Sequence, residues 1–563
     1  MERHQLRARV AGAVSQGASY LLDRQRPDGG WTDRLSSSAM PTAIAALALA
    51  EAGSDDHGQR VAASVGWLRE QQREDGGWGL ADADPPSDGS VTAFALAALA
   101  ALDPEGSRRC IERATAFIEK LGGRSAILPN VRTWRELVSI IWAMTGMTPP
   151  QQQPVQPMEI MLLPAGFRNR ASIALPGVIG LGAWQSRVMS LSWPARIARK
   201  IAEPRGLQWL RSVQGSNGGM EECPLMAALV YLGLHKSGPD TGADIQRGCL
   251  SYLLATQRPD GSWAIDRDLE VAVTAYSVLA MAEQECVTDD GRLGATREWL
   301  LGQQWREPFR PLRLPAGGWS WANPTGWPES EDTAVVLSAL RQLGVPAGDP
   351  AMIAGRDWLL SRQNSDGSWS EWVRNSSMVH DGPCAGVTAH VVMAFRDLGV
   401  TRDSQPAIGR AFRYFARAQD ADGGIPSLWF RDRTHGTAKL LEAYAHFGQA
   451  GEETAQRARR WLIATQREDG GWPLTAADGS PADATAEETA WALYSLLAAG
   501  EPAWDDHITA AVDWLAAHQD MAGTWRPSAV GLYYDQMYYS DDLIAHTYPL
   551  RALGRWLGAA ALT

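Results

Sequence analysis

The chain has 563 residues, of which 52 are Lys or Arg and 64 are Asp or Glu, giving a formal net charge of −12. This length suffices for two or more domains with separate cores, and the acidic balance argues against nucleic acid as the main partner. The sequence has no run of about twenty apolar residues, so we expect no membrane-spanning helix, and its first residues do not resemble a signal peptide.

The numbers of tryptophan and cysteine residues give further indications about the protein. There are 25 Trp against 9 Phe and 12 Tyr, and a Trp ring can fill a core or line a pocket that receives a cation. The cysteines are odd in number, scattered and without a CxxC pair, so we expect reduced thiols in a cytoplasmic protein. They are Cys110, Cys223, Cys249, Cys286 and Cys384.

One short pattern, Gln-x3-Gly-x-Trp, recurs along the chain. Neighbouring copies often lie roughly 45 to 55 residues apart, which is typical of helical-repeat architectures. Clear copies occupy 25–31, 72–78, 257–263, 363–369, 466–472 and 519–525, and weaker copies begin at Gln214 and Gln419.

Each copy stands between two predicted helices, for example "AASVGWLREQ" before and "SVTAFALAALAAL" after the second copy. The Asp-Gly and Gly-Gly pairs predict tight turns. We expect the Gln amide to bind helix-end groups and the Trp ring to pack across the turn. Helix pairs repeated in this way predict either a closed α/α barrel or an open solenoid.

Two segments interrupt the repeat. Residues 147–164 contain too many prolines for a continuous helix and are predicted to form a connector. Residues 171–200 are apolar and end with Arg196, Arg199 and Lys200. They fit a buried helix pair, or a patch on a membrane surface whose basic residues face the headgroups.

Three acids precede an apolar helical run in "WPESEDTAVVLSAL", residues 327–340. Glu329, Glu331 and Asp332 would be costly to bury together, which suggests a function for them. The alternative is that they only favour the start of a helix, where negative charge interacts well with the backbone dipole.

Five longer motifs then occur in a recognisable order: "EIMLLP" (159–164), "GGWSWANPTGWPESEDTAVVLSAL" (317–340), "GVTAHVVMAF" (386–395), "LWFRDRTHGTAKLLEAY" (428–444) and "YYSDDLIAHTYPLRALGRW" (538–556). With the Gln/Trp repeats, the chain resembles squalene-hopene cyclase and other class II terpene cyclases nearly end to end. The resemblance implies an all-α fold of two α/α barrels with an aromatic-lined cavity between them. Residues 1–15 and 266–563 would form the catalytic barrel, and 16–265 the inserted second barrel.

The resemblance also assigns the acids. Class II cyclases start by protonating an alkene or epoxide of a linear isoprenoid, which demands a strong, protonated carboxylic acid. Their motif is Asp-x-Asp-Asp followed by Thr-Ala, with the middle Asp as donor. On this sequence Glu331 would be the acid, Asp332 and Glu329 would tune it, and His390 would hydrogen-bond to it.

Glutamate at the donor position departs from the family pattern. Its extra methylene would move the proton by about 1 Å or more, enough to change rates by orders of magnitude. Three interpretations follow: a differently seated substrate, an easier group such as an epoxide, or a site that has lost its activity.

Aromatic faces would stabilise the migrating cation without capturing it. Ala272 stands where family members carry a further tryptophan, whereas the Trp residues of the repeat turns are expected to be structural. By motif, the residues expected to contact substrate are Trp321, Trp372, Trp142, Trp491, Tyr533, Tyr534, Tyr538 and Tyr539, with the register of the four tyrosines left open.

The expected reaction is cyclisation of squalene or another polyprenyl chain without a cofactor. An alternative is a Mg²⁺-dependent cyclase of a C15 or C20 prenyl diphosphate or of a prenylated aromatic. Asp82, Asp84 and Asp88 could then hold Mg²⁺, with Arg132 and Arg135 in the same half of the chain, although acid-rich loops are usually solvated surface.

A second alternative is a barrel that binds isoprenoids without catalysis. A prenyltransferase β-subunit shares the barrel, but no cysteine here stands in a context that suggests its Zn²⁺ site. The partners expected are an isoprenoid, the inner face of the membrane through residues 171–200, and a second copy of the chain.

Overall fold

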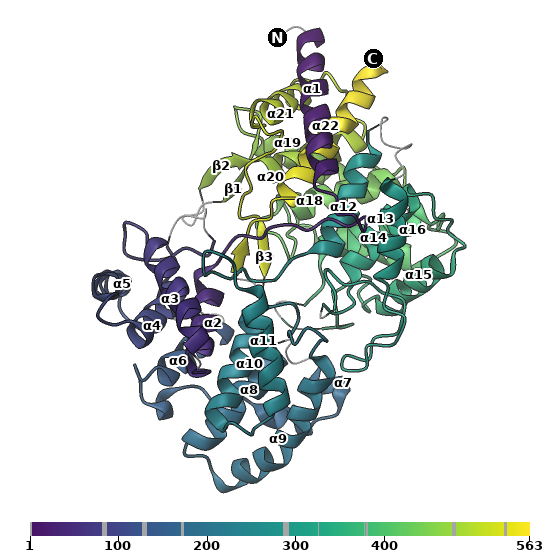
Figure 1. The fold of residues 1–563 in the computed structure, drawn as a ribbon. Coiled ribbons are helices and arrows are strands. Elements are labelled where there is room, and N and C mark those ends of the chain that lie inside the picture. The colour runs from purple at the N-terminus through teal and green to yellow at the C-terminus, as the bar shows by residue number, and fades with distance from the viewer. Residues whose placement is uncertain are drawn as a thin grey trace. The chain divides into compact units, whose positions relative to one another are not determined.

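The computed structural model describes residues 3–53, 55–81, 87–125, 132–169, 174–284, 292–324, 326–376, 378, 381–475, 480–533 and 537–562. The chain forms two compact units (Figure 1). Unit 1 comprises Met1–Arg34, Asp268–Asn323 and Trp327–Thr563, and unit 2 comprises Leu35–Arg267 and Pro324–Gly326. Both are mostly helical, which confirms the predicted fold class.

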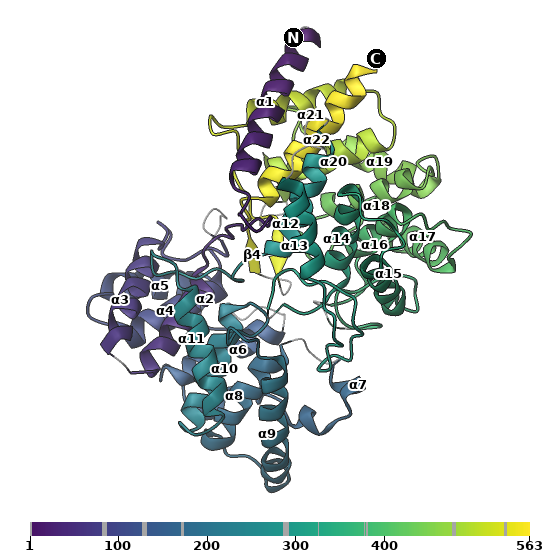
Figure 2. The same cartoon turned by 45° about the vertical axis from the view of Figure 1, so that its right-hand side comes forward.

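Unit 1 is built around a ring of six inner helices, whose arrangement can be followed in Figure 2. Consecutive members pack against each other, and the last packs against the first, so the ring is closed. Closure confirms the α/α barrel over the open solenoid for this unit. The members are α12 (Glu270–Ala282), α14 (Ser330–Gln342), α16 (Ala385–Asp397), α18 (Thr434–His446), α20 (Ala486–Ala498) and α22 (Ile544–Ala561).

Outer helices cover this ring, and their sequences differ from those of the inner helices. Most of α20 is buried, whereas α19 buries only Ala455, Ala458 and Leu462. Burial on one side explains the amphipathic pattern of the outer helices. They are α1 (Arg3–Asp23), α13 (Arg292–Gly302), α15 (Pro350–Arg362), α17 (Pro406–Ala418), α19 (Glu453–Thr465) and α21 (Asp506–Ala517).

The repeated turns join outer to inner helices as the sequence predicted. In the turn at 363–369, the Gln363 amide donates to Gly367 O at 2.9 Å and to Ala407 O at 2.8 Å, near the start of α17. The Trp369 indole N–H donates to Leu359 O at 2.7 Å, ten residues earlier. Gly367 has φ +100°, a backbone conformation that favours glycine.

One repeat escaped the sequence pattern. Gln304 donates to Gly317 O and Ala351 O, both at 2.9 Å, and the Trp319 indole donates to Leu300 O at 2.8 Å. These are the bonds of a Gln/Trp turn, with extra residues inserted between its Gln and its Gly. The turn leads directly into α14 and therefore positions the acid motif.

Unit 2 has the same helix-pair design. Helices α2, α4 and α6 pack in series, α8 packs on α10, α10 packs on α2, and the segment η1 touches both α6 and α8. The elements are α2 (Ala39–Glu51), α3 (Asp55–Glu70), α4 (Gly89–Leu102), α5 (Arg108–Lys120), α6 (Arg132–Met144), η1 (Pro150–Gln152), η2 (Met158–Leu162), α7 (Ala165–Arg168), α8 (Leu175–Val188), α9 (Trp193–Val213), α10 (Pro224–Ser237) and α11 (Ala243–Thr256).

Two glycines allow the closest approach in unit 2. A Cβ added to Gly233 would lie 2.2 Å from the backbone of Gly180, so α8 and α10 meet backbone to backbone. The proline-rich connector contains only the short 3₁₀ turns η1 and η2, as its prolines predicted.

Two short antiparallel ribbons of unit 1 were not anticipated. Strand β1 (Trp472–Thr475) pairs with β2 (Pro481–Thr485) before α20, and β3 (Gly531–Tyr533) pairs with β4 (Met537–Tyr539) before α22. Among the described residues, no helix combines the length and apolar character needed to cross a membrane.

Candidate active site

The predicted acids lie at the start of α14 and are buried. Glu329 caps the helix, and its backbone N–H donates to Trp319 O at 2.9 Å, so the inserted turn fixes its position. The Ser330 hydroxyl donates to Ser370 O at 2.7 Å, which ties the same turn of helix to the loop after Trp369.

Glu331 has partners on both neighbouring inner helices. His390 of α16 places Nδ1 3.0 Å from Glu331 Oε1, at an angle that does not form a hydrogen bond. The Tyr276 hydroxyl of α12 donates to the same oxygen at 3.1 Å. The backbone N–H of Glu331 donates to Glu371 Oε2 at 3.0 Å. The structure thus brings together Glu331 and His390, the pair that the sequence placed in one site.

The buried acids differ in their proton affinity. Burial opposes the charged form of Glu331, but His390, Tyr276 and the Lys439 ammonium outweigh it and lower its pKa. Burial and the neighbouring carboxylates raise the pKa of Glu329 and Glu371, and burial raises that of Asp332 to about 7. Glu331 is therefore the strongest acid of the group, and its neighbours hold protons near neutral pH.

Three of these residues were missed by the sequence analysis. Glu371 stands two residues after the turn tryptophan Trp369. Tyr276 occupies the position on α12 that His390 occupies on α16, two residues after the threonine that binds the preceding turn. The repeat could therefore have identified Tyr276 as a neighbour of the acid, whereas nothing local distinguishes Glu371.

Lys439 is the third. It is 1% exposed on α18, its Nζ lies 2.8 Å from Glu442 Oε1, and it faces the Tyr548 ring at 5.2 Å. A buried lysine is held in its charged form only by such a partner. Its sequence context, "GTAKLLEAY", reads as an ordinary helix.

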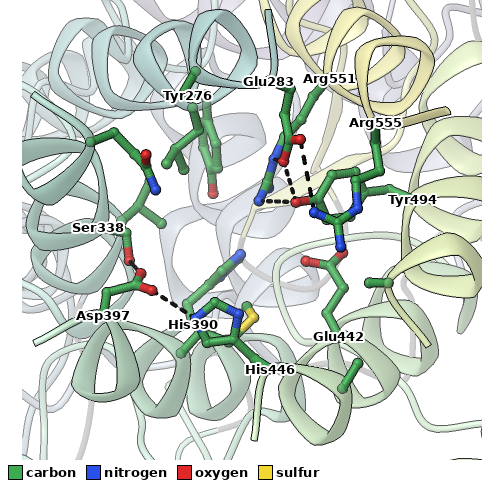
Figure 3. A pocket seen from close by; sticks show the side chains of 17 residues that line it. Tyr276, Glu283, Ser338, His390, Asp397, Glu442, His446, Tyr494, Arg551 and Arg555 are labelled. Atoms are coloured by element: carbon green, nitrogen blue, oxygen red, sulfur yellow. Dashed lines mark hydrogen bonds and ion pairs between the residues drawn. The ribbon is translucent and has the colours of Figure 1, made fainter. Parts of the chain in front are cut away.

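A cavity of about 480 Å³ lies along the barrel axis, in the C-terminal half of the inner helices (Figure 3). Tyr276 and His390, which both contact Glu331, line it together with Glu442 and Arg551. Figure 3 shows these side chains converging on the cavity from different helices. His446, whose side chain is 41% exposed, also lines it and contacts Asp397 at 2.7 Å, so the cavity extends from the acid's partners to solvent-exposed groups.

Aromatic rings form a connected series around the acid cluster. Trp372 contacts Trp321, Trp327 and Trp429 with ring centroids 5.3 to 6.2 Å apart, and Trp429 contacts Tyr533 at 6.0 Å. Deeper in the barrel, Trp491 packs on His435 at 4.7 Å and on Tyr548 at 5.4 Å. Tyr548 in turn packs on Tyr276 at 5.2 Å.

These tryptophans differ from those of the turns in the hydrogen bonding of their indole N–H groups. Each turn Trp donates its N–H to a leucine carbonyl. The indole nitrogens near the acids are buried without a hydrogen-bond partner, although a buried indole usually finds one. These tryptophans are Trp321, Trp327, Trp372, Trp429 and Trp491; Trp209 of unit 2 shares this property.

The other aromatic positions named by motif have surroundings of their own. Trp142 belongs to unit 2, where its indole donates to Ala93 O at 2.9 Å. Tyr538 lies under the Arg431 guanidinium at 4.0 Å, and Tyr539 packs over Gly531. Ala272, at the family's tryptophan position, is buried in α12. Tyr534 lies outside the described residues.

Of the three proposed magnesium ligands, Asp88 alone lies within the described residues. Asp88 caps α4 by accepting from Val91 N at 2.8 Å, so its carboxylate has a structural partner. Asp82, Asp84 and the side chains of Arg132 and Arg135 lie outside the described residues. Within those that are described, no three His, Cys, Asp or Glu side chains converge on a point where a metal could bind.

Comparisons with known proteins agree on one family. The model of the squalene-hopene cyclase C-terminal domain matches residues 270–558, and that of the N-terminal domain matches residues 14–172. The squalene-hopene cyclase of Alicyclobacillus acidocaldarius is 28% identical over 557 residues, 84% of this chain and 86% of that protein. The enzyme of Bradyrhizobium diazoefficiens is 30% identical over 300 residues, and this match covers less than half of either protein, 46% and 44%.

A solved structure shares the whole fold. The ent-copalyl diphosphate synthase from Streptomyces platensis superimposes with a TM-score of 0.61 over 98% of this chain and 99% of that one, at 20% identity.

Proposed function

The chain belongs to the squalene-hopene cyclase family of class II terpene cyclases, and we propose that it cyclises a linear polyprenyl hydrocarbon such as squalene, with Glu331 as the acid. One observation carries the assignment of the acid: Glu331 is buried in the catalytic barrel and is contacted by His390 and Tyr276 from the two flanking helices. An acid that only favoured the start of a helix would not need to be buried or to have side-chain partners on two other helices.

The environment of Glu331 suits alkene protonation. A donor to an alkene must be a strong acid, and its conjugate base must be stabilised as the proton leaves. Tyr276 donates a hydrogen bond to the carboxylate, and the positive charge of Lys439 also stabilises its ionised form. Because its own pKa is lowered, Glu331 must take up a proton before it can donate one. Glu329 and Asp332, whose raised pKa values favour the protonated form and whose side chains hydrogen-bond each other, are a source of that proton within the motif.

The reaction then proceeds by charge migration. Transfer of the proton from Glu331 to one alkene carbon uses the π electrons for the new C–H bond and leaves a cation on the other carbon. Attack by the next alkene closes a ring and moves the cation along the chain. The faces of Trp321, Trp372 and Trp429 stabilise that charge, because a ring face attracts a cation without forming a bond to it.

The axial cavity offers Glu331 a route to a new proton. His390 and Tyr276 separate the carboxyl from the cavity, and His446 connects the cavity with the surface. Water in a cavity with this many polar groups would have the partners it needs. We assign proton return to this path.

A hydrocarbon substrate is supported by an exposed apolar face on unit 2. Trp193, Ile197 and Ile201 recur every four residues on α9 and are 67%, 44% and 49% exposed, and Phe167 of α7 is 71% exposed. Arg196 and Lys200 are also exposed on α9. This combination favours contact with an anionic membrane surface, from which such a substrate would come.

The basic part of the predicted patch needs one correction. Arg199 does not face headgroups, because it is buried and its Nε donates to Glu159 Oε1 of the "EIMLLP" motif at 2.8 Å. The apolar part is also divided, since α8 is mostly buried and α9 carries the exposed residues.

The test is incubation with squalene, oxidosqualene, farnesyl diphosphate and geranylgeranyl diphosphate, each with and without Mg²⁺, analysed by mass spectrometry. We expect a cyclic product from squalene without Mg²⁺ and none from Glu331→Gln. A product only from a diphosphate in the presence of Mg²⁺ would refute the hydrocarbon assignment. Binding without turnover of any probe would favour an isoprenoid-binding protein.

A further inference from the structure

A repeated hydrogen bond fixes how each inner helix of unit 1 is rotated. The backbone N–H of a turn residue donates to a threonine hydroxyl on α12, α14, α16, α18 and α20, at 2.9 to 3.0 Å. Because successive residues advance by about 100°, positions two before and two after that threonine lie on the opposite side of the helix. The threonines are Thr274, Thr333, Thr388, Thr437 and Thr489.

The positions two after the threonine face the barrel axis. Tyr276, Val335 and His390 hold these positions on the first three helices, and all three line the axial cavity. The positions two before the threonine are one turn nearer the start of each helix and point the same way. They are Ala272, Glu331, Gly386, His435 and Glu487.

Glu487 therefore holds on α20 the place that Glu331 holds on α14. In the closed ring of six, α14 and α20 are opposite members, with two helices between them on either side. Packed neighbours about 8–10 Å apart put opposite axes at roughly 16–20 Å, which leaves on the order of 5–10 Å between two inward-facing glutamates. A small fused ring system fits such a space.

The protein supplies a hydrogen bond to only one of the two carboxyl oxygens of Glu487. It is fully buried, and its Oε1 accepts from the Ser528 backbone N–H at 2.8 Å. Its Oε2 is buried without a hydrogen-bond partner. A carboxyl oxygen left in that state costs free energy, and its retention points to a group supplied from outside the protein.

The two glutamates also differ in charge environment. Glu331 has His390 and Lys439 as cationic neighbours, which lower its pKa. Burial raises the pKa of Glu487 to about 7, opposed only by hydrogen bonds from Ser528 and its own backbone. In its ionised form Glu487 is therefore the more basic of the two carboxylates.

We propose that Glu487 is the base that ends the cyclisation. This rests on the proposed function. Glu331 gives a proton to the first alkene, and ring closure carries the cation toward α20. A C–H bond beside the final cationic carbon then breaks, its electron pair forms the product alkene, and the proton passes to Glu487 Oε2. Substrate and product are isomers, and exchange with solvent restores both carboxyls between turnovers.

The position of the base also limits the product. A proton acceptor on the opposite side of the barrel, on the order of 5–10 Å from the donor, suits a cation that has moved by about two fused rings. The favoured product is a bicyclic alkene formed at one end of the chain, with the remaining double bonds unchanged.

The experiment compares Glu487→Gln with the wild type on whichever of the four probes the wild type consumes, using mass spectrometry of all products. Glu488→Gln is the matched control, because Glu488 is the next residue, is equally buried and undergoes the same change of side chain. We expect Glu487→Gln to consume substrate but to lose at least 90% of the alkene in favour of water-captured alcohols or other isomers. Glu488→Gln should keep the wild-type product ratio.

Three outcomes overturn the proposal. Unchanged product ratios in Glu487→Gln refute it, and so does an equal change in both variants, which would indicate a general charge effect. If Glu487→Gln does not fold, as judged by thermal unfolding, Glu487→Met replaces it, since it also lacks a proton acceptor, and an unchanged ratio there is equally negative. Absence of turnover by the wild type is a different result: it removes the proposed function and this inference with it.

Discussion

Removal of the buried Lys439 ammonium tests directly how the charges around Glu331 are balanced. In Lys439→Met, Glu442 loses the ammonium 2.8 Å from its Oε1 while remaining 3% exposed. Breaking a buried ion pair on one side usually costs about 3–5 kcal/mol, because an uncompensated charge remains. Arg551 also favours the charged form of Glu442, so we expect the lower end, about 3 kcal/mol.

Such a loss should be visible as a fall of about 4 °C in the melting temperature of a unit of this size. The double variant Lys439→Met/Glu442→Gln removes both charges and should recover most of the stability, since replacing a whole buried pair is often nearly neutral. Turnover should fall several-fold in both variants, because Glu331 loses a cation that lowers its pKa.

The stability that the Lys439–Glu442 pair contributes should depend on pH in a definite direction. The pair lowers the pKa of Glu442, so its stabilisation is present above the unfolded pKa and is lost as the pH falls through the folded one. The difference between wild type and Lys439→Met should thus be larger at pH 8 than at pH 4, measured by denaturant unfolding. A single variant as stable as the wild type, or a double variant no more stable than the single, would refute the reasoning.

Four further results are expected. Glu331→Gln should abolish turnover, with at least a 10³-fold loss expected for a missing general acid, while thermal unfolding shows the fold intact. Trp369→Phe should destabilise by about 1–3 kcal/mol because it loses the indole bond to Leu359 O, whereas Trp372→Phe, whose indole has no partner, should alter products more than stability. Trp193→Glu/Ile197→Glu should reduce sedimentation with anionic vesicles at least tenfold, and equal binding by both proteins would rule out that face. Acids with raised folded pKa, such as Asp332 and Glu487, stabilise as the pH falls below that pKa, so denaturant unfolding should show unit 1 more stable at pH 5.5 than at pH 8, by up to about 2 kcal/mol per group.

Local patterns in the sequence predicted much of this protein. Helix pairs, turns and the roles of Gln363 and Trp369 follow from periodicity and turn chemistry, because these bonds form within a few residues or between adjacent elements. The acid motif and His390 came from the family resemblance, since residues some sixty positions apart carry no local sign that they will meet. The inserted turn at Gln304 was missed because its spacing differs from the repeat, although its bonds do not.

What the sequence determined by itself is therefore the architecture of repeated helix pairs, because periodicity and turn chemistry are short-range, whereas the acid motif needed the family resemblance. Only the tertiary structure decided that Tyr276, Glu371 and Lys439 surround Glu331, that Arg199 is buried, and which tryptophans lack an indole partner. The physical reason is ring closure. It brings helices distant in the chain to a common axis, where burial and nearby charge, rather than residue type, set the proton affinity of each carboxyl.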